Sequence, residues 1–379
     1  MLDFLTLRQK AFGLDISDLS LKIVNLKKNG GKFKMVSHGE KDIAPGVIRE
    51  GRIVEQEKLV SLIEETLQEV KGEKLSSNYV VASLPEERAF FKVIQMPKIQ
   101  EGDLRSAVIY EAENYIPMPI EQVYLDFQVV PPLQGELDHL DVLIGAVPKE
   151  MVDPYLFALK EAGLEPKALE VESLAITRAL IKDEISPSPV LLIDFGATRT
   201  SFIIFSGHAL RFTTSISVSS ASFTEIIAKN LGVPLKEAEE LKKKYGLEEK
   251  IKLKMDREET DLRKKRSKIF EILMPALIDL AQQIDKHLHY YQTHSSHEHL
   301  PPDNQGVSKI LLCGGGSNLK GLPEFLEQKI NIPVELGNPW VNILTEEEKP
   351  TMPLSKSMAY TTALGLALRG AKKENSDYD

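Results

Sequence analysis

The sequence predicts an α/β protein in which two similar domains face each other across a cleft, with a small satellite domain inserted in the first. Residues 190–207 contain an apolar run that ends at Asp194, a loop with glycine and threonine, and a second apolar run. This pattern is typical of a buried strand, a tight turn and the antiparallel partner strand. Residues 11–26 repeat it around Asp15. A single acidic hairpin is more often an ordinary turn, but the repetition favours two matching domains.

The loops of these hairpins have the chemistry of phosphate sites. Gly196 allows the backbone to come close to a ligand, and backbone N–H groups suit phosphate oxygens. The hydroxyls of Thr198 and Thr200 belong to the same loop, and Asp194 suits a hydrated Mg²⁺. In the first hairpin, Lys22 starts the departing strand and can reach back over the loop. Together the two loops would hold one nucleotide.

Length and composition exclude several classes of protein. The chain has 379 residues, enough for two or three domains, and its 42% hydrophobic and 27% charged residues are ordinary for a globular protein. A formal net charge of −9 argues against a nucleic-acid binder. Cys313 is the single cysteine, and we find neither a signal peptide nor a run of the ~20 apolar residues that a membrane helix needs. We expect a cytoplasmic protein without direct membrane insertion.

The first domain is expected to comprise residues 1–85, 148–186 and 350–370. After a turn at Asn29-Gly30-Gly31, apolar periodicity predicts a strand, a helix and a buried strand at residues 32–43, 54–70 and 78–84. Further helices are predicted at residues 149–162, 172–181 and 357–368. Residues 185–189, rich in proline and serine, resemble a hinge-like linker.

Residues 86–147 are expected to form the satellite domain. The pattern predicts a strand, a helix and two strands at residues 89–95, 101–115, 123–130 and 140–147. Ile116-Pro117-Met118-Pro119 ends the helix, because proline cannot continue one.

The second domain is expected to comprise residues 187–349, with a charged subdomain near residues 235–268. Beyond its hairpin, the pattern predicts a strand at 209–218, helices at 221–231, 234–245 and 267–292, a strand at 307–313, a helix at 321–329 and a strand at 334–336. Pro275 should kink the long helix unless the helix begins near it. The tail, residues 371–379, is expected to be disordered.

Three further groups are candidates for contacts with a nucleotide. Gly314, Gly315, Gly316 and Ser317 follow a predicted buried strand and would let a helix start press against an adenine ring, although a plain turn has the same pattern. Glu239 and Lys242 lie three residues apart on one helix face, which suits ribose hydroxyls or a surface ion pair. Glu172 begins the helix that precedes the second hairpin, so it is the candidate for orienting water if phosphate is hydrolysed.

Other chemistry has little support in the sequence. No Ser/His/Asp or Cys/His arrangement stands out, so we do not propose covalent catalysis. Five histidines lie between His287 and His299, at a predicted helix end that Pro301-Pro302 follows. We interpret them as a solvated helix end and loop, because no cysteine or strand framework accompanies them.

Several motifs, spread over nearly the whole chain, match one known family. They are Gly13-Leu14-Asp15 with Lys22, Gly46-Val47-Ile48, Gly51-Arg52-Ile53, Glu111-Ala112-Glu113-Asn114-Tyr115-Ile116-Pro117, Glu161-Ala162-Gly163-Leu164-Glu165-Pro166, Asp194-x-Gly196 with Thr200, Leu312-Cys313-Gly314-Gly315-Gly316 and Ala363-Leu364-Gly365-Leu366-Ala367. With these residues the chain resembles the PilM family of actin-like proteins of type IV pilus assembly, which is itself similar to the cell-division protein FtsA. The Glu111–Pro117 segment separates PilM-like chains from sugar kinases and chaperones of the same superfamily.

The resemblance implies a fold, a cofactor and a partner. It implies two actin-like (ribonuclease-H-like) domains, with residues 86–147 as a satellite domain of the 1C or SHS2 type. It implies ATP with Mg²⁺, the metal held through water by Asp15 and Asp194, and the phosphates held by Ser17, Ser20, Lys22, Gly196, Thr198 and Thr200. Glu239 and Lys242 would face the ribose, and residues 314–317 the adenine. PilM-like proteins also bind the cytoplasmic N-terminal segment of PilN, an inner-membrane protein, in a groove between the first and satellite domains.

Two departures from the family pattern concern the phosphate loops. Ser17-Asp18-Leu19 stands where members usually carry Gly-Ser-Ser, which places an extra negative charge near the phosphates at a cost on the order of 1 kcal/mol. Ser219-Ser220 stands where the family often has Gly-Gly. Both concern nucleotide affinity more than the fold.

The leading hypothesis is an ATP-binding scaffold of the inner-membrane platform that builds type IV pili for twitching motility. It would be at most a slow ATPase, and its nucleotide state would set the cleft angle and partner binding. The first alternative, a sugar or acetate kinase, would need an acid in a second substrate pocket. The second, an FtsA-like filament former, would be expected to end in a basic amphipathic helix rather than in the polar residues 370–379. Self-association and coupling between nucleotide and partner stay open.

Overall fold

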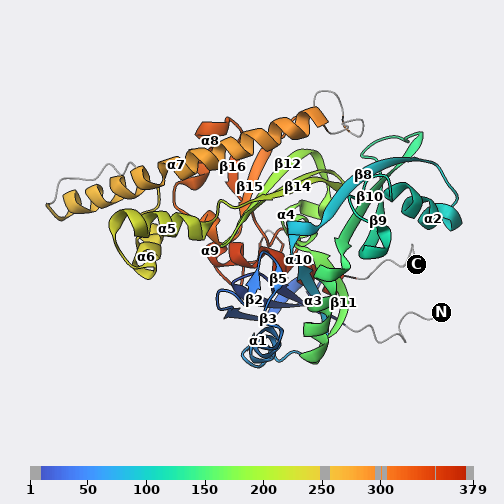
Figure 1. Ribbon diagram of the computed structural model, residues 1–379, viewed down its shortest axis with the longest axis horizontal. Coiled ribbons are helices and arrows are strands. Elements are labelled where there is room, and N and C mark those ends of the chain that lie inside the picture. The colour runs from blue at the N-terminus through green and yellow to red at the C-terminus, as the bar shows by residue number, and fades with distance from the viewer. Residues whose placement is uncertain (1–9, 248–256, 295–299, 301–304, 346, 373–379) are drawn as a thin grey trace. The chain divides into compact units, whose positions relative to one another are not determined.

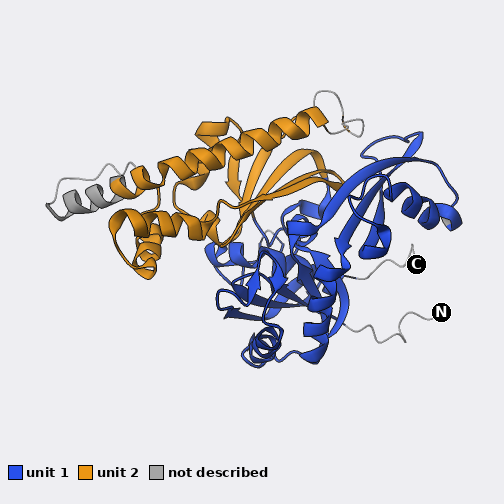
Figure 2. Cartoon of the chain, in the orientation of Figure 1, with its two compact units in different colours: residues 1–185, 338–379 blue, residues 186–337 orange. Residues whose placement is uncertain are grey.

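The computed structural model describes residues 10–247, 257–294, 300, 305–345 and 347–372 (Figure 1). The chain divides into two compact units (Figure 2). Unit 1 comprises Met1–Ile185 and Asn338–Asp379, and unit 2 comprises Ser186–Gly337. Both combine β-sheets with helices, as the sequence predicts. Among the described helices, none has the length and apolar character that crossing a membrane requires.

The two units contain the same arrangement of five strands. In unit 1 the order is β3-β2-β1-β7-β11, and β6 extends the sheet beyond β3; in unit 2 it is β14-β13-β12-β15-β16. The unit 1 strands are β1 (Phe12–Ile16), β2 (Ser20–Asn29), β3 (Lys32–Asp42), β6 (Lys71–Gly72), β7 (Tyr79–Leu84) and β11 (Glu165–Val171). The unit 2 strands are β12 (Ser186–Phe195), β13 (Thr200–Gly207), β14 (Ala209–Ile216), β15 (Lys309–Cys313) and β16 (Val334–Leu336).

Strand directions match as well. In each unit the first three strands of this arrangement are antiparallel. The central strand, β1 or β12, also pairs in parallel with β7 or β15, and that strand pairs in parallel with β11 or β16. The two predicted acidic hairpins, β1–β2 and β12–β13, therefore occupy equivalent positions in their sheets.

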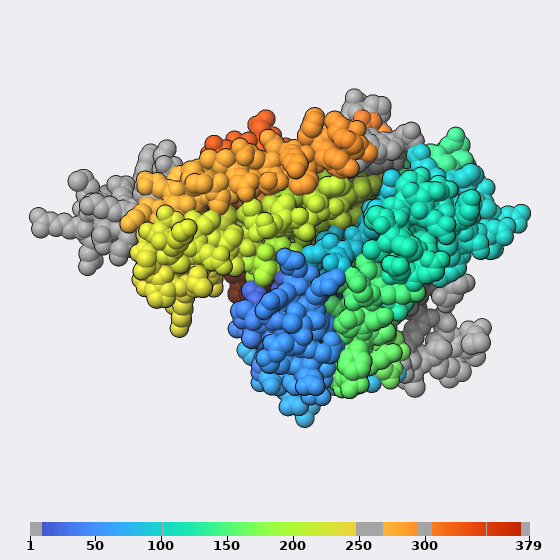
Figure 3. Space-filling model, in the orientation of Figure 1, coloured from blue at the N-terminus to red at the C-terminus, as the bar shows by residue number. Residues whose placement is uncertain are grey.

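Helices cover both faces of the unit 1 sheet. They are α1 (Gln56–Gln68), α3 (Lys149–Glu161), α4 (Glu172–Leu180) and α10 (Thr361–Ala371), and the short helix α9 (Leu354–Ser357) precedes α10. On one face α1 and α3 lie side by side, and Figure 3 shows their blue and green surfaces in contact. Leu14 of β1 belongs to this core, whereas its neighbour Gly13 faces α10, because strand residues alternate between faces. A Cβ on Gly13 would lie 2.5 Å from the Ala363 carbonyl oxygen, so glycine permits this close approach.

The satellite domain has the predicted strand, helix, strand, strand order. Its elements are β8 (Phe90–Pro97), α2 (Glu101–Ala112), β9 (Val123–Val130) and β10 (His139–Pro148). The strands form a separate sheet in the order β8-β10-β9, and α2 buries Leu104, Val108 and Ala112 in its core. A two-stranded ribbon that the pattern did not predict, β4 (Ile48–Arg49) and β5 (Arg52–Ile53), precedes α1.

Unit 2 contains four described helices that contribute to its core. They are α5 (Ser220–Leu231), α6 (Leu235–Tyr245), α7 (Arg257–His294) and α8 (Leu322–Ile330). The long helix α7 packs against α5, α6 and α8 (Figure 1). It starts ten residues earlier than predicted and continues through Pro275. Residues 248–256 of the predicted charged subdomain, and 373–379 of the predicted disordered tail, lie outside the described residues.

Three segments differ from the expectations. Residues 186–189 of the expected linker already belong to strand β12. Residues 165–171, to which the sequence pattern assigned no strand, form β11 and pair with β7. Asn338 and the residues that follow belong to unit 1 rather than to the second domain, because Trp340 and Ile343 are buried in a core that α10 shares.

Candidate functional site

The first hairpin brings four predicted site residues together. Asp15 and Lys22 are direct partners across β1 and β2, so their side chains share one face, and both are buried (5% and 8% exposed). Lys22 Nζ donates to Ser20 Oγ, and Ser17 Oγ lies 3.0 Å from Ser20 Oγ. The Ser17 N–H also donates to the Ser20 carbonyl oxygen, at 3.0 Å. A carboxylate, two hydroxyls and an ammonium therefore occupy one turn.

The carboxyl ends of three parallel strands meet beside this turn. In β7, Ser83 Oγ donates to Asp15 Oδ1 (3.2 Å) and accepts the Ile16 N–H (2.7 Å). In the next strand, β11 ends at Val171, the register partner of Leu84, and buried Glu172 follows as the first residue of α4. Ligands of α/β sheets characteristically bind at the carboxyl ends of parallel strands. Asp15 and Glu172, predicted from separate parts of the chain, thus stand at one edge of a single sheet.

The second hairpin places Asp194 between Ser201 of β13 and Cys313 of β15, its register partners. The Gly196 N–H donates to the Arg199 carbonyl oxygen at 3.0 Å, and Thr200 Oγ1 donates to the Val218 carbonyl oxygen at 2.6 Å. These two donors, expected to face phosphate, are thus engaged within the loop, whereas Thr198 is exposed at the turn.

The second loop is fixed on the start of helix α5. The Ser220 and Ala221 N–H groups donate to the carbonyl oxygens of Gly196 and Ala197, both at 3.0 Å. Ser219 caps the same helix: its Oγ accepts the Ser222 N–H, while Ser222 Oγ accepts the Ser219 N–H. The serines found in place of the family's glycines therefore help to form the loop's support.

The glycine run lies directly against Asp194. Gly314 follows β15 with φ +81°, and a Cβ there would lie 2.2 Å from Asp194 Oδ1. A Cβ on Gly316 would lie 2.7 Å from the Phe195 carbonyl oxygen, and Ser317 Oγ donates to the Gly314 carbonyl oxygen at 2.6 Å. Side chains at these positions would collide with the strand end that carries the acid. Glycine therefore permits the close approach of this loop to the end of the strand that carries the acid.

Glu239 and Lys242 form more than a surface ion pair. Lys242 is 5% exposed, and its Nζ donates to the carbonyl oxygen and Oγ of Ser220 (both 2.7 Å), to Thr224 Oγ1 (2.8 Å) and to Glu239 Oε2 (2.7 Å). Burial lowers the pKa of Lys242, and Glu239 opposes that shift. Burial would raise the pKa of Glu239, but hydrogen bonds from Lys242 and Thr224 hold it below its usual value. The pair joins α6 to the start of α5.

Asp18 has a role that the sequence did not reveal. Its side chain is 7% exposed, and Oδ1 accepts the N–H of Gly51 at 3.0 Å. Gly51 lies at the tip of the ribbon β4–β5, and its carbonyl oxygen accepts the hydroxyl of Tyr155 in α3 at 2.8 Å. Burial, with the charges of Glu172, Asp18 and Asp15, raises the pKa of Tyr155 far above its usual range, so its hydroxyl keeps its proton. The side-chain oxygen of Asp18 thus helps to hold the ribbon.

A surface cavity of about 160 Å³ lies beside the same ribbon. It is lined by Gly51, Arg52 and Ile53 of the ribbon and by Glu150, Met151 and Pro154 of α3. Arg52 Nη2 and Arg88 Nη1 both contact Glu150 Oε1, at 3.0 and 2.5 Å. Tyr124 of the satellite strand β9 donates its hydroxyl to Asp153 of α3 at 2.9 Å. The cavity therefore lies where the first and satellite domains are connected.

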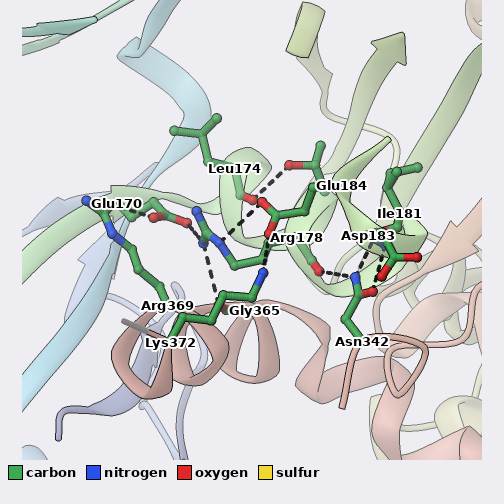
Figure 4. Close-up of polar contacts among 11 residues, drawn as sticks. Glu170, Leu174, Arg178, Ile181, Asp183, Glu184, Asn342, Gly365, Arg369 and Lys372 are labelled. Carbon is green, nitrogen blue, oxygen red and sulfur yellow. Dashed lines mark hydrogen bonds and ion pairs between the residues drawn. The ribbon is translucent and has the colours of Figure 1, made fainter. Parts of the chain in front are cut away.

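A buried cluster of ion pairs supports the first sheet (Figure 4). The fully buried carboxylate of Glu170 contacts Arg178 of α4 and Arg369 of α10. Glu170 is the register partner of Ser83, the residue that holds Asp15. Asn342 donates to the carbonyl oxygens of Arg178 (2.8 Å) and Ile181 (2.7 Å) and so holds the end of α4. The cluster fixes β11, α4 and α10 behind the site.

The histidine run makes aromatic contacts where the structure describes it. The rings of Phe202 and Phe212 lie 5.4 and 6.0 Å from that of His287, and His294 stacks on Tyr290. Residues 295–299, with His297 and His299, lie outside the described residues. Within the described part, no three His, Cys, Asp or Glu residues gather in a group suited to a metal ion.

Comparison with known proteins identifies one family. The family model described as "Type IV pilus assembly protein PilM" matches residues 13–371. A solved PilM-PilN type IV pilus biogenesis complex is 29% identical, with a TM-score of 0.76, covering 97% of this chain and 100% of that chain. FtsA of Pseudomonas aeruginosa is 27% identical over 226 residues, 57% of this chain and 50% of FtsA, so the chain spans about half the length of this curated relative.

A more distant structure shares the fold alone. MreB5 of Spiroplasma citri bound to AMPPNP is 15% identical, with a TM-score of 0.53 and 95% of each chain covered. These matches confirm the predicted α/β, actin-like fold class.

Proposed function

Because the chain belongs to the family of type IV pilus assembly protein PilM, we propose that it is an ATP-binding actin-like scaffold of the pilus assembly platform. The observation that carries this proposal is the duplicated sheet, which presents Asp15 and Asp194 at equivalent strand ends. Each acid stands beside a loop of polar side chains or glycine, and these groups fit a phosphate with its metal. The AMPPNP-bound MreB5 structure, which shares the fold, is consistent with a nucleotide ligand.

The residues divide into roles toward the nucleotide. Asp15 and Asp194 would hold hydrated Mg²⁺, which would screen the charge of the phosphates. The phosphates would be bound by Ser17, Ser20 and Lys22 of the first loop and by the exposed Thr198 of the second. Gly196 and Thr200, whose donors are engaged within the second loop, would fix its shape. Ribose lies at Glu239 and Lys242, whose network with Ser220 fixes their positions. Adenine lies against Gly314, Gly315, Gly316 and Ser317.

Hydrolysis, if present, is slow and depends on Glu172. This side chain is buried at the start of α4, beside the strand ends that carry Asp15 and Ser83, where it can orient water toward a bound phosphate. ATP turnover by Glu172→Gln, in a variant that still binds ATP, tests this role. Unchanged turnover would remove Glu172 from the reaction.

The partner is the cytoplasmic N-terminal segment of a PilN-like protein of the inner membrane, and the similarity to a solved PilM-PilN complex supports a PilN-like partner. We place it at the cavity between the ribbon and α3. The exposed Val54 and Phe157 flank the lining residues in the sequence and offer apolar contacts, while Arg52 and Glu150 offer polar ones. Binding there would hold the protein at the inner membrane.

A second candidate function is self-association into filaments, which the similarity to FtsA favours. Sedimentation of the protein with Mg-ATP, with and without the PilN-like peptide, distinguishes the two. A scaffold stays in the supernatant and binds peptide, whereas a filament former pellets in the presence of nucleotide.

The proposed function is tested by calorimetry with two ligands. Mg-ATP is titrated into the full chain, and then a synthetic peptide of the N-terminal segment of the PilN-like protein from the same organism. We expect one ATP and one peptide per chain. Phe157→Glu, at an exposed residue beside the cavity, should abolish peptide binding, whereas Glu64→Gln, exposed on α1, should preserve it. Absence of ATP binding or of peptide binding to the wild type would refute the proposal.

A further inference from the structure

One residue of the first phosphate loop directly contacts the wall of the cavity. Asp18 follows Ser17 in the loop, and its Oδ1 accepts the Gly51 N–H at 3.0 Å. Gly51 itself lines the cavity, together with its neighbours Arg52 and Ile53. The candidate nucleotide loop and the candidate partner cavity are therefore one hydrogen bond apart, although 33 residues separate the two groups in the sequence.

The ribbon tip is held from both sides. Its carbonyl oxygen accepts the Tyr155 hydroxyl at 2.8 Å, from the helix that forms the opposite wall of the cavity. Glu50 and Gly51 have φ values of +49° and +72°, as the two central residues of a type I′ turn require. A Cβ on Gly51 would lie 2.5 Å from Pro85 Cβ, so the turn is packed as well as bonded. A tight turn fixed at its N–H and C=O moves only if one of these bonds changes.

We propose that Asp18 couples the two sites, so that nucleotide at the first loop and a peptide in the cavity raise each other's affinity. This inference rests on the proposed function and specifies its regulation. A phosphate near Ser17 and Lys22 repels the Asp18 carboxylate and favours the arrangement in which that carboxylate stays on Gly51. This arrangement keeps the ribbon in the position that shapes the cavity. By linkage, a peptide that packs on the ribbon favours the same arrangement and tightens nucleotide binding by the same factor.

The charge of Asp18 provides the coupling, whereas its side-chain oxygen holds the ribbon in position. Asp18→Asn keeps an acceptor for Gly51 and removes the charge. Asp18→Ala removes both, and Tyr155→Phe removes the other bond to Gly51. Glu64→Gln, exposed on α1, is the matched control for the loss of one negative charge.

Hydrogen exchange and calorimetry test the inference together. In the wild type, Mg-ATP should slow amide exchange in residues 44–56 and raise the affinity for the PilN-like peptide roughly fivefold. Mg-ATP should have the same two effects on the control variant Glu64→Gln. Asp18→Asn should bind the peptide as the wild type does without nucleotide but show no effect of Mg-ATP. Asp18→Ala and Tyr155→Phe should speed exchange in residues 44–56 and weaken the peptide without nucleotide.

The outcomes separate this inference from the proposed function. If wild type binds both ligands but neither changes the other's affinity, the coupling is refuted and the scaffold stands. If Asp18→Ala leaves exchange in residues 44–56 unchanged, the hydrogen bond does not hold the ribbon and the inference is also refuted. If the wild type binds no ATP or no peptide, the proposed function is refuted and the inference with it.

Discussion

The buried carboxylate of Glu170 provides the sharpest test of how the first sheet is held together. Its side chain is fully buried, and the two arginine side chains that pair with it are 16% exposed (Arg178) and 33% exposed (Arg369). Glu170→Gln keeps the volume but leaves these cations without their main counter-charge. Breaking a buried pair costs about 3–5 kcal/mol. The remaining contact of Arg178 Nε with Glu184, at 3.7 Å, and the partial exposure of Arg369 place the expected loss near the lower end, about 3 kcal/mol.

Fluorescence of the single tryptophan measures this loss in the correct unit. Trp340 is 2% exposed and lies in the unit 1 core with Tyr360 and Leu364, so its emission follows the unfolding of unit 1 in guanidinium chloride. The control is Glu165→Gln at the exposed start of the same strand, which should change the free energy of unfolding by less than about 0.5 kcal/mol. A loss below about 1 kcal/mol for Glu170→Gln, with an unchanged dependence on denaturant, would contradict the reasoning.

Three further predictions concern other sites. Gly314→Ala should weaken Mg-ATP binding roughly tenfold or more in calorimetry, because its Cβ would lie 2.2 Å from Asp194 Oδ1. The control Gly306→Ala, whose Cβ meets open space, should leave the affinity unchanged. Equal affinities of the two variants would remove Gly314 from the site. Burial, with the nearby charge of Asp194, raises the pKa of Cys313. A thiol reagent at pH 8 should therefore label no cysteine in the folded protein and one cysteine in denaturant. Rapid labelling of the folded protein would contradict this burial. Burial lowers the pKa of His38 in the folded protein, and the charges of Lys356 and Lys71 add to this shift. The contribution of neutral His38 to stability is therefore present above pH 6.5 and is lost as the pH falls through the lowered pKa of the folded protein. Between pH 7 and 5 the wild type should therefore lose more thermal stability than His38→Gln, and equal losses would refute this assignment.

The sequence predicted the features that depend on local patterns. Both acidic hairpins, the satellite elements and most helices follow from apolar periodicity and from turn residues a few positions apart. The repeated sheet could be anticipated because each hairpin carries its own copy of the signal around Asp15 or Asp194.

The features that the sequence did not predict depend on contacts between distant segments. Asp18 appeared to be an unfavourable charge, because nothing local shows that Gly51 lies within reach of its carboxylate. The partners of Glu170 come from α4 and α10, and Arg369 is 199 residues away. Asn338 and its neighbours were assigned to the wrong unit because the position of Trp340 is decided by core packing rather than by periodicity.

The central claim of the proposed function is that Asp15 and Asp194 both bind the metal of a nucleotide. It is tested most directly by titrating Mg-ATP into the wild type, Asp15→Asn, Asp194→Asn and the double variant. The wild type should bind one ATP per chain, and each single variant should bind ATP at least roughly tenfold more weakly. The loss of binding free energy in the double variant should be smaller than the sum of the losses in the two single variants, because both acids act on one ion. Full affinity in either single variant, or two ATP molecules per chain, would contradict the claim.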